Sequence, residues 1–582
     1  MKELELLEVS FEVANKVGGI YQVLSSKSSK MVDFYGDGYL TVGYYDEASM
    51  RKEFAPRENP YDEVFEKLSQ EGIECYYGVW EVEGSPRTIL VDASNLKKDV
   101  SEIKESYWKN HGIDSYNAGH DFDDPVKWGY AVSRLVEELE KNNDFVVQLH
   151  EWLSSGPVFH CESPTVFTTH ATVLGRALSN SQHDLLSMIE EDDMDDEGLA
   201  QELGVKAKHD MEKAAAKESN VFTTVSDITG KEASVIHGIE PDKILPNGFN
   251  VGDYPSLEDL SVNHKNKKDE VKEFLHAYFD PYYSLELGED PRIFFTSGRY
   301  EFHNKGFDVL IEALGKINEK PGEDLYFFFL VPSDVKGPDM EVLENKSLYE
   351  ELEDYVESKM PELRRHFVNS VASGEDPLPA VQECLKDSGQ LEFLQENFHK
   401  KRGSEGPPIS AFELNYENDD IIESLKSQGI TNSESDRVKV VFYPTYLSVG
   451  DKLLSMDYED MVVASSAGFF PSYYEPWGYT PVETAANGAL ALTSDLAGFG
   501  QFLIEEADAS DRTGIEILER SGRKREDVVE DLAKTIEEFL SFDKTEITER
   551  KHNARKLAQL TSWDKLGENY REAHKMAVNN HD

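Results

Sequence analysis

The fold of this chain is constrained above all by an alternation of short apolar runs with helical patterns, which occurs in two successive series. Short apolar runs bounded by turn residues are typical of buried strands, whereas Val126–Leu139 has the period of an amphipathic helix. The strands predicted in the first series are Leu4–Val9, Tyr39–Gly43, Thr88–Val91, Phe145–His150, Thr165–Thr169, Val221–Val225 and Lys243–Leu245. Those predicted in the second series are Arg292–Ser297, Leu325–Val331, Val438–Phe442, Gly468–Pro471, Leu490–Ser494 and Gly514–Leu518.

Strands that alternate with helices predict an α/β protein, here with two Rossmann-like, doubly wound domains that face each other across a cleft. Residues 1–255 form the first predicted domain and residues 256–550 the second, and the polar stretch at 254–270 is interpreted as the link between them. The alternation stops between about 335 and 435, where a charged helical pattern predicts an insertion in the second domain. Residues 551–582 are predicted to form a C-terminal helix that packs back on the first domain.

The chain is strongly acidic, with 113 Asp and Glu against 59 Lys and Arg and a formal net charge of −54. This balance argues against nucleic acid or anionic lipid as a partner, because such partners require a basic surface. Self-repulsion of this size is relieved when salt shortens the Debye length to about 3 Å at 1 M. We therefore expect a salt-accumulating halophile as the source; an ordinary acidic enzyme is the alternative.

Nothing in the sequence suggests a membrane segment or a disulfide framework. The first residues carry charges where a signal peptide needs an apolar run, and no stretch approaches the roughly 18 apolar residues of a membrane span. Cys75, Cys161 and Cys384 are far apart and lack metal-ligand spacing. We interpret them as reduced thiols and expect a cytoplasmic protein.

Ligands of doubly wound sheets bind beyond the carboxyl ends of the strands, so the residues that follow predicted strands are the candidate site residues. Asn15–Ile20 follows the first strand and opens a helix. Gly18 and Gly19 would let the backbone approach a phosphate at the helix N-terminus, and Lys16 would add a positive charge. The alternative is an ordinary tight turn.

Two further segments in the first domain place histidines at strand ends. His150, Glu151 and Trp152 follow one strand, and they form either a buried polar strand terminus or a wall of a sugar site. His170 ends the next strand, with Arg176 six residues later. A lone histidine is more often structural, but the arginine makes contacts with sugar hydroxyls and phosphate plausible.

In the second domain, cations follow one strand and carboxylates another. Arg299 and Lys305 lie in a glycine-containing turn after the first strand, where they either balance a leaving diphosphate or form exposed ion pairs. Glu475 and Glu483 lie in a segment that runs from Tyr474 through Trp477, Gly478, Tyr479 and Thr480. Glu475 is expected in a loop at the cleft and Glu483 in the first turn of a helix, where one carboxylate would bind the sugar and the other ribose hydroxyls.

These segments together resemble the eukaryotic-type glycogen synthases, which are family 3 glycosyltransferases with the GT-B fold. The similar segments are Phe11–Tyr21, Thr168–Arg176, Phe222–Ser226, Pro246–Val251, Gly298–Gly306 and Phe470–Pro481, and together they cover nearly the whole chain. The resemblance implies transfer of glucose from UDP-glucose to the non-reducing 4-OH end of an α-1,4-glucan, with retained anomeric configuration and without a metal or other cofactor. With the charge, it makes a halophilic archaeon the expected source.

The resemblance also implies a role for each candidate residue. Arg299 and Lys305 would hold the diphosphate beside Gly18 and Gly19, and His170 and Arg176 would face the reaction centre. Glu475 would contact the donor glucose and Glu483 the ribose. The remaining donor-binding candidates are Lys16, Tyr474, Trp477, Gly478, Tyr479 and Thr480, and the candidate wall of the sugar site is His150, Glu151 and Asn247.

The insertion resembles the family's oligomerisation region, which implies a homotetramer. The resemblance implies an arginine cluster that binds glucose 6-phosphate in eukaryotic members; here 544–553 mixes lysine and arginine with glutamate and uncharged residues, so we expect no activation by that ligand. Two alternatives to glucan synthesis stay open. One is another GT-B transferase that makes a disaccharide or a different polysaccharide, and the other is an inactive glucan-binding scaffold, against which Arg299, Lys305, Glu475 and Glu483 argue.

Overall fold

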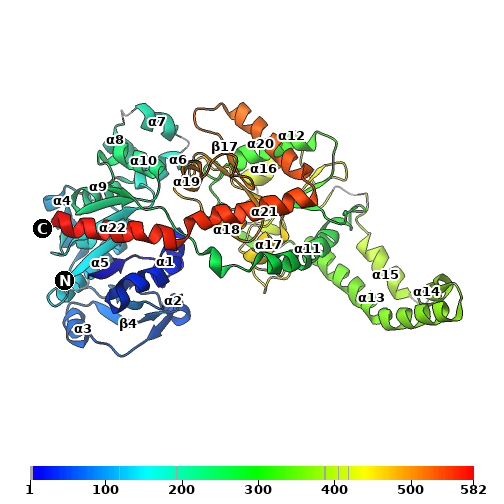
Figure 1. Ribbon diagram of the computed structural model, residues 1–582, viewed down its shortest axis with the longest axis horizontal. Helices are drawn as coiled ribbons and strands as arrows, with labels where there is room; N and C mark the ends of the chain where they lie inside the picture. Colours follow the sequence, from blue (N-terminus) through cyan, green and yellow to red (C-terminus); the bar gives the residue numbers. More distant parts are fainter. Residues whose placement is uncertain are drawn as a thin grey trace.

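The computed structural model describes residues 4–116, 118–181, 183–191, 194–385, 389–403, 406–416 and 418–581. Figure 1 shows two α/β lobes side by side and a helical arm that extends from the second lobe, away from the first. Both chain termini lie in the first lobe. Among the described residues, no helix combines the length and the apolar character needed to cross a membrane.

The first lobe is built on a nine-stranded sheet with the order β3-β4-β5-β2-β1-β6-β7-β8-β9. Its strands are β1 (Glu5–Val9), β2 (Tyr39–Tyr44), β3 (Phe54–Pro56), β4 (Glu74–Trp80), β5 (Arg87–Asp92), β6 (Phe145–His150), β7 (Thr165–Thr169), β8 (Val221–Thr224) and β9 (Lys243–Ile244). The seven predicted strands are present and pair in parallel. The prediction missed β3 and β4, which form an antiparallel edge. In β4, partly exposed residues interrupt the apolar pattern on which the prediction relied.

The second lobe is built on a six-stranded parallel sheet with the order β14-β11-β10-β15-β16-β17. The strands are β10 (Arg292–Ser297), β11 (Leu325–Leu330), β14 (Val438–Phe442), β15 (Ala467–Phe469), β16 (Leu490–Ser494) and β17 (Ile515–Leu518). Counted along the chain, this order is 3-2-1-4-5-6, the Rossmann arrangement. The order reverses between β10 and β15, so a ligand crevice is expected beyond the carboxyl ends of these two strands.

Helices cover both sheets. In the first lobe they are α1 (Gly19–Tyr35), α2 (Glu47–Glu53), α3 (Asp62–Ser69), α4 (Val100–His111), α5 (His120–Leu139), α6 (Val173–Asn180), α7 (Leu185–Glu191), α8 (Asp196–Glu202), α9 (Lys206–Glu218) and α10 (Asp227–His237). Around the second sheet they are α11 (Leu257–Phe279), α12 (Phe307–Asn318), α16 (Asp420–Ser427), α17 (Tyr458–Ala464), α18 (Tyr479–Ala486), α19 (Gly498–Glu506), α20 (Arg525–Ser541) and α21 (Lys544–Ala558).

The interpretation of 254–270 as a polar link is wrong, because most of this stretch belongs to helix α11. The Ser256 hydroxyl accepts a hydrogen bond from the Asp259 N–H and caps the helix. Further along α11, Val271, Phe274 and Leu275 are buried in a core cluster of the second lobe that also includes residues of α17. The polar residues of the stretch therefore form the solvent face of an amphipathic helix.

The last helix, α22 (Trp563–His581), returns to the first lobe and packs along α1 (Figure 1). Trp563 is buried, and its indole N–H donates to the Ser26 hydroxyl at 2.8 Å. The Trp563 ring lies so close to Gly248 that a β-carbon at Gly248 would be 2.3 Å from it. The polypeptide thus crosses between the lobes a second time, which ties them together.

The helical arm consists mainly of α13 (Met340–Ser373), α14 (Pro377–Leu385) and α15 (Gly389–Phe398) (Figure 1). A short antiparallel pair, β12 (Val335–Pro338) and β13 (Phe412–Leu414), lies at its base. Several large apolar side chains on the arm are exposed: Val356, Met360, Phe367, Val368, Val371, Leu378 and Phe393.

Candidate active site between the two lobes

Residues that follow β7 and β8 contact residues that follow β10 and β15, so the two lobes meet at the carboxyl ends of their sheets. The Asn304 amide donates to Asn180 Oδ1 at 2.6 Å, and the Tyr474 hydroxyl donates to Glu232 at 3.0 Å. The Ser226 hydroxyl donates to the Pro476 carbonyl at 2.7 Å. Tyr474 therefore lies where the two lobes meet, and Arg176 of the first lobe lies close enough to Glu475 of the second for the two charges to interact.

Lys305 and Glu475 form an ion pair at the topological switch point of the second sheet. Their side chains are only 15% and 20% exposed, which makes this pair much less hydrated than a surface pair. Gly306 is essential to the turn that carries Lys305: its φ is 71°, and a β-carbon there would lie 1.9 Å from the Pro471 carbonyl oxygen. The two predicted charges are thus brought together by backbone that only glycine can adopt.

Arg299 lies in the same turn but is more accessible. Its side chain is 62% exposed and pairs with Glu301 at 3.1 Å. An exposed pair of this kind contributes little to stability, so Arg299 can exchange its partner for an anionic ligand at small cost.

The loop that carries Glu475 is fixed by its own backbone. The Gly498 N–H donates to the Glu475 carbonyl at 3.0 Å, and Gly478 has a φ of 101°. Helix α18 follows at once, and Glu483 is its fifth residue, just past the first turn in which it was predicted. Burial and the charge of Glu459 raise the pKa of Glu483 to about 7, and Lys16 opposes the shift.

The N-terminus of α1 holds a carboxylate that the sequence analysis did not single out. Glu12 Oε2 accepts hydrogen bonds from the Gly18 N–H at 2.9 Å and from the Tyr21 N–H at 2.7 Å. Burial raises the pKa of Glu12, while the two backbone hydrogen bonds and the charge of Arg299 oppose the rise. A carboxyl group therefore already accepts from backbone N–H groups where a phosphate was predicted. The open space around Gly19 is the remaining approach to it.

His150 and His170 are linked in a buried hydrogen-bond chain that begins at Lys27. The Lys27 ammonium donates to Glu8 Oε1 at 2.5 Å, and His150 Nε2 lies 2.8 Å from the same oxygen. Lys27 and His150 hold the pKa of Glu8 far below its usual range against the effect of burial, so the carboxylate is charged and only accepts. His150 must then carry its proton on Nε2.

This proton fixes the tautomer of the second histidine. Burial lowers the pKa of both His150 and His170, so both imidazoles are neutral. His150 Nδ1 has no proton and accepts from His170 Nε2 at 2.9 Å. His170 is left with Nδ1 as an acceptor. A neutral acceptor suits a sugar hydroxyl and cannot balance a diphosphate.

Glu151 and Arg176 complete the first-lobe side of the cleft. Glu151 is a non-glycine residue with a φ of 66°, and its Oε1 accepts from the His170 N–H at 2.9 Å. Such backbone strain is typical of functional sites. Burial and the charge of Glu212 raise the pKa of Glu151. Burial alone would lower the pKa of Arg176, but negative neighbours including Glu151 and Glu475 raise it above its ordinary value.

Other predicted site residues are less directly exposed to the cleft. Trp477 is 4% exposed and packs against Phe502, while the Tyr479 hydroxyl donates to the Gly248 carbonyl at 3.2 Å. Asn247 is buried, and within the described residues its Oδ1 has no hydrogen-bond partner. A buried amide oxygen without a partner is costly, which is compatible with the predicted place of Asn247 in the wall of the sugar site. The ligand roles assigned to these residues stay predictions.

A second cavity, of about 1420 Å³, lies away from this cleft between α11 and α21. Lysines dominate its cations: Lys268 pairs with Asp290 at 2.5 Å, and burial lowers the pKa of Lys551 to about 7. The segment 544–553 contributes Lys544 and Lys551 to this wall. The expected lack of activation by glucose 6-phosphate stays a prediction.

Two Rossmann-like lobes with charged residues at facing strand ends define a glycosyltransferase of the GT-B class. The catalytic domain of starch synthase IV from Arabidopsis thaliana, solved with ADP and acarbose, matches 99% of this chain and 100% of that chain with a TM-score of 0.53 and 14% identity, a likeness of fold.

Sequence comparison is more specific. A family model described as glycogen synthase matches residues 8–581. The glycogen [starch] synthase of Neurospora crassa is 32% identical over 98% of this chain and 83% of that protein. The liver glycogen [starch] synthase of Mus musculus is 30% identical over 99% of this chain and 84% of that protein. The chain belongs to the glycogen synthase family.

Proposed function

We propose that this family member transfers glucose from UDP-glucose to the non-reducing 4-OH end of an α-1,4-glucan, with retention of configuration and without a metal ion. The observation that carries the proposal is the Lys305–Glu475 pair at the switch point of the second sheet, with Arg299 beside it. Cations at this crevice suit a nucleotide diphosphate, and an adjacent carboxylate suits sugar hydroxyls. The names of the glycogen [starch] synthase relatives support glucan synthesis.

The donor diphosphate would bind between Arg299, Lys305 and the α1 N-terminus at Gly18 and Gly19. It would compete with Glu475 for Lys305 and with Glu301 for Arg299, and both pairs exchange one anion for another. Negative charge that develops on the leaving diphosphate would meet cations already in position, which is the main source of electrostatic catalysis. Lys16, near Glu483, would add charge on the ribose side.

The sugar would lie against the first lobe. His170, with Nδ1 as an acceptor, would accept from a glucose hydroxyl, and Arg176 would stabilise charge at the reaction centre. Glu475 would hold the donor glucose from the opposite side. Neither glutamate acts as a nucleophile in this account: donor and acceptor react on one face, the acceptor oxygen bonds to the anomeric carbon, and the departing phosphate oxygen takes the acceptor proton. Catalysis then rests on positioning and on fixed charges.

The test of donor choice is incubation with glycogen and either UDP-glucose or ADP-glucose in concentrated KCl, with nucleotide release as the readout. We expect faster release from UDP-glucose. Faster release from ADP-glucose would overturn the donor assignment but keep the glucan synthase assignment, and release that is independent of glycogen would contradict an α-glucan acceptor.

We propose in addition that the protein is a homotetramer assembled through the arm. The arm carries exposed apolar side chains, among them Met360 and Phe367, which are 52% and 49% exposed. Such side chains favour association of the arms of different subunits. Light scattering coupled to gel filtration should give four times the mass of 65.9 kDa. Phe367→Ser should shift the mass toward smaller species. A monomeric wild-type protein would contradict the proposal.

The charge of the protein supports a halophilic origin, from an archaeon with a salt-rich cytoplasm in which the protein would work. A net charge of −54 destabilises the folded state by self-repulsion, and concentrated salt screens this repulsion.

A further inference from the structure

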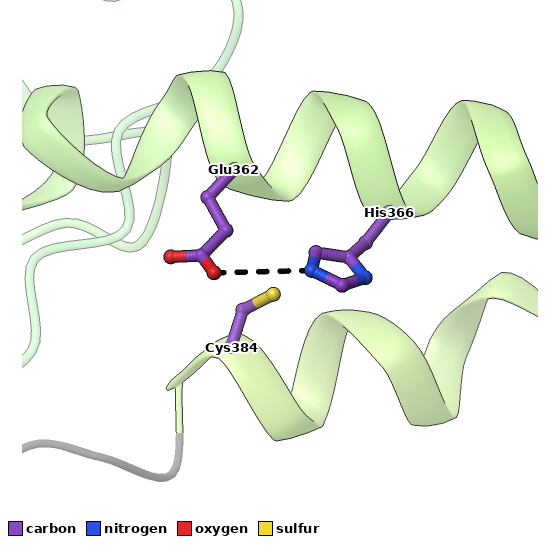
Figure 2. Close-up of side chains that lie close together, drawn as sticks. All are labelled: Glu362, His366 and Cys384. Atoms are coloured by element: carbon purple, nitrogen blue, oxygen red, sulfur yellow. Dashed lines mark ion pairs between the residues drawn. The ribbon is translucent and has the colours of Figure 1, made fainter.

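A carboxylate, an imidazole and a thiol converge near the far end of the helical arm, remote from the cleft. They belong to Glu362, His366 and Cys384, and one potential ligand atom from each lies within 4.8 Å of the others. Figure 2 shows Glu362 and His366 on one helix and Cys384 approaching them from the facing helix. The first two are on α13 and the third is on α14.

The spacing of the two α13 residues explains why they meet. Positions i and i+4 lie on one face of a helix, and the Glu362 carboxylate is 3.8 Å from His366 Nε2. Helices α13 and α14 pack against each other as a hairpin, which brings Cys384 on α14 to this face of α13. The cysteine spacing in the sequence gave no sign of it, because the other two donors are not cysteines.

We propose that Glu362, His366 and Cys384 bind a divalent transition metal ion of the zinc class. Sulfur, nitrogen and oxygen donors together are typical of Zn²⁺ sites and unsuited to Ca²⁺ or Mg²⁺, which prefer oxygen. Bond lengths of about 2.0–2.3 Å place tetrahedral ligand atoms roughly 3.5 Å apart. The three ligand atoms now lie within 4.8 Å of one another, so they would move closer together as the metal binds. Water completes the fourth position.

Binding has a defined proton balance. The Cys384 thiol loses its proton to solvent as the metal–sulfur bond forms, and the imidazole binds in its neutral form. No oxidant or reductant takes part. The metal would clamp α13 to α14 near the tip of the arm.

An ordinary helix ion pair is the competing explanation for two of these residues. Glu362 also lies 3.8 Å from Arg365, so its charge is partly balanced without a metal. An exposed pair of this kind contributes little to stability and gives no reason for a thiol at the same point. Burial raises the pKa of Cys75 and of Cys161, which makes these two thiols poor metal ligands and suitable controls.

Cobalt(II) titration of the full-length, chelator-treated protein in concentrated KCl tests the site. We expect one strongly bound Co²⁺ per chain, with a thiolate-to-cobalt charge-transfer band, intense tetrahedral d–d bands, and displacement of both by Zn²⁺. Cys384→Ser should abolish the charge-transfer band, and His366→Ala should weaken binding at least about tenfold. Cys161→Ser should leave the titration unchanged, and circular dichroism of each variant confirms the fold.

Three outcomes would overturn the proposal. The first is a wild-type titration without a charge-transfer band. The second is the same band in Cys384→Ser. The third is weak octahedral binding that only reflects the acidic surface and that both variants retain.

Discussion

Glu8 and His150 are hydrogen-bonded beneath the cleft, with 2.8 Å between the carboxylate Oε1 and the imidazole Nε2. Both side chains are completely buried. The same oxygen accepts from Lys27, which is also buried and lies 3.8 Å from the centroid of the Tyr570 ring. One charged pair in the interior therefore sets the tautomer of two histidines, and through them the hydrogen-bonding character of His170.

This pair predicts strong coupling in stability. Glu8→Gln should lower the free energy of unfolding by about 3 kcal/mol or more, because it leaves the Lys27 charge buried without a partner. Lys27→Met should lower it by as much, because it leaves the Glu8 charge buried without a partner. The double variant should cost clearly less than the sum. Urea unfolding in concentrated KCl measures all three, and additive or sub-kilocalorie effects would show that the pair is not coupled as described.

The cations and carboxylate of the cleft predict large losses of turnover. Arg299→Ala, Lys305→Ala and Glu475→Gln should each lower kcat about 100-fold or more if they act on the transition state. Lys316→Ala is the matched control, because Lys316 pairs with Glu530 on the surface, where both are about half exposed. Initial rates at saturating donor concentration measure kcat for each variant. A decrease in kcat of less than about threefold in the cleft variants would refute the assignment.

Glu232 predicts a pH dependence of stability. Burial raises its pKa from an ordinary value of 4.5 to about 7, although the Thr172 and Tyr474 hydroxyls oppose the shift. The folded state thus holds this proton more tightly than the unfolded state, so the contribution is complete below pH 4.5 and is lost as pH rises through 7.

Glu232→Gln removes this linkage and should flatten the stability profile between about pH 5 and pH 8 relative to wild type. Urea midpoints measured across that range test it. Glu530→Gln, at an exposed position, is the control for net charge. An unchanged slope in Glu232→Gln would mean that Glu232 is ionised in the folded protein at neutral pH.

The net charge predicts dependence on salt. At about 0.1 M salt the Debye length is about 10 Å, and at 1 M it is about 3 Å, so repulsion among the surface carboxylates falls sharply over this interval. The urea midpoint should rise with KCl concentration. A midpoint that is already maximal in dilute buffer would rule out salt dependence and favour an ordinary acidic enzyme.

Most of the fold could be predicted because parallel strands buried on both faces are nearly continuous apolar runs, as in Phe294–Phe295 and Leu325–Leu330. Strand β4, next to the edge of the sheet, was missed and helix α11 was misread for the opposite reason, because exposed residues mask their period. The local pattern of apolar residues indicates which elements are buried, and this pattern is weak in elements that are half exposed.

The candidate site divides in the same way. Arg299, Lys305 and Glu475 could be named as candidates because charges directly after buried strands have few structural explanations. Glu8 and Glu12 were not, since a glutamate within a strand or loop carries no signal of its own in a chain with 113 acidic residues. Their partners, His150 for Glu8 and the Gly18 N–H for Glu12, are supplied only by the tertiary structure.

Extension of α-glucans by this protein is measured by following label from UDP-[¹⁴C]glucose into glycogen in concentrated KCl. We expect incorporation into polymer that an exo-acting α-1,4-glucosidase releases as glucose, and loss of incorporation in Glu475→Gln. Folded wild-type protein that leaves glycogen unlabelled with either UDP- or ADP-glucose, or that places the label in a disaccharide, would contradict it.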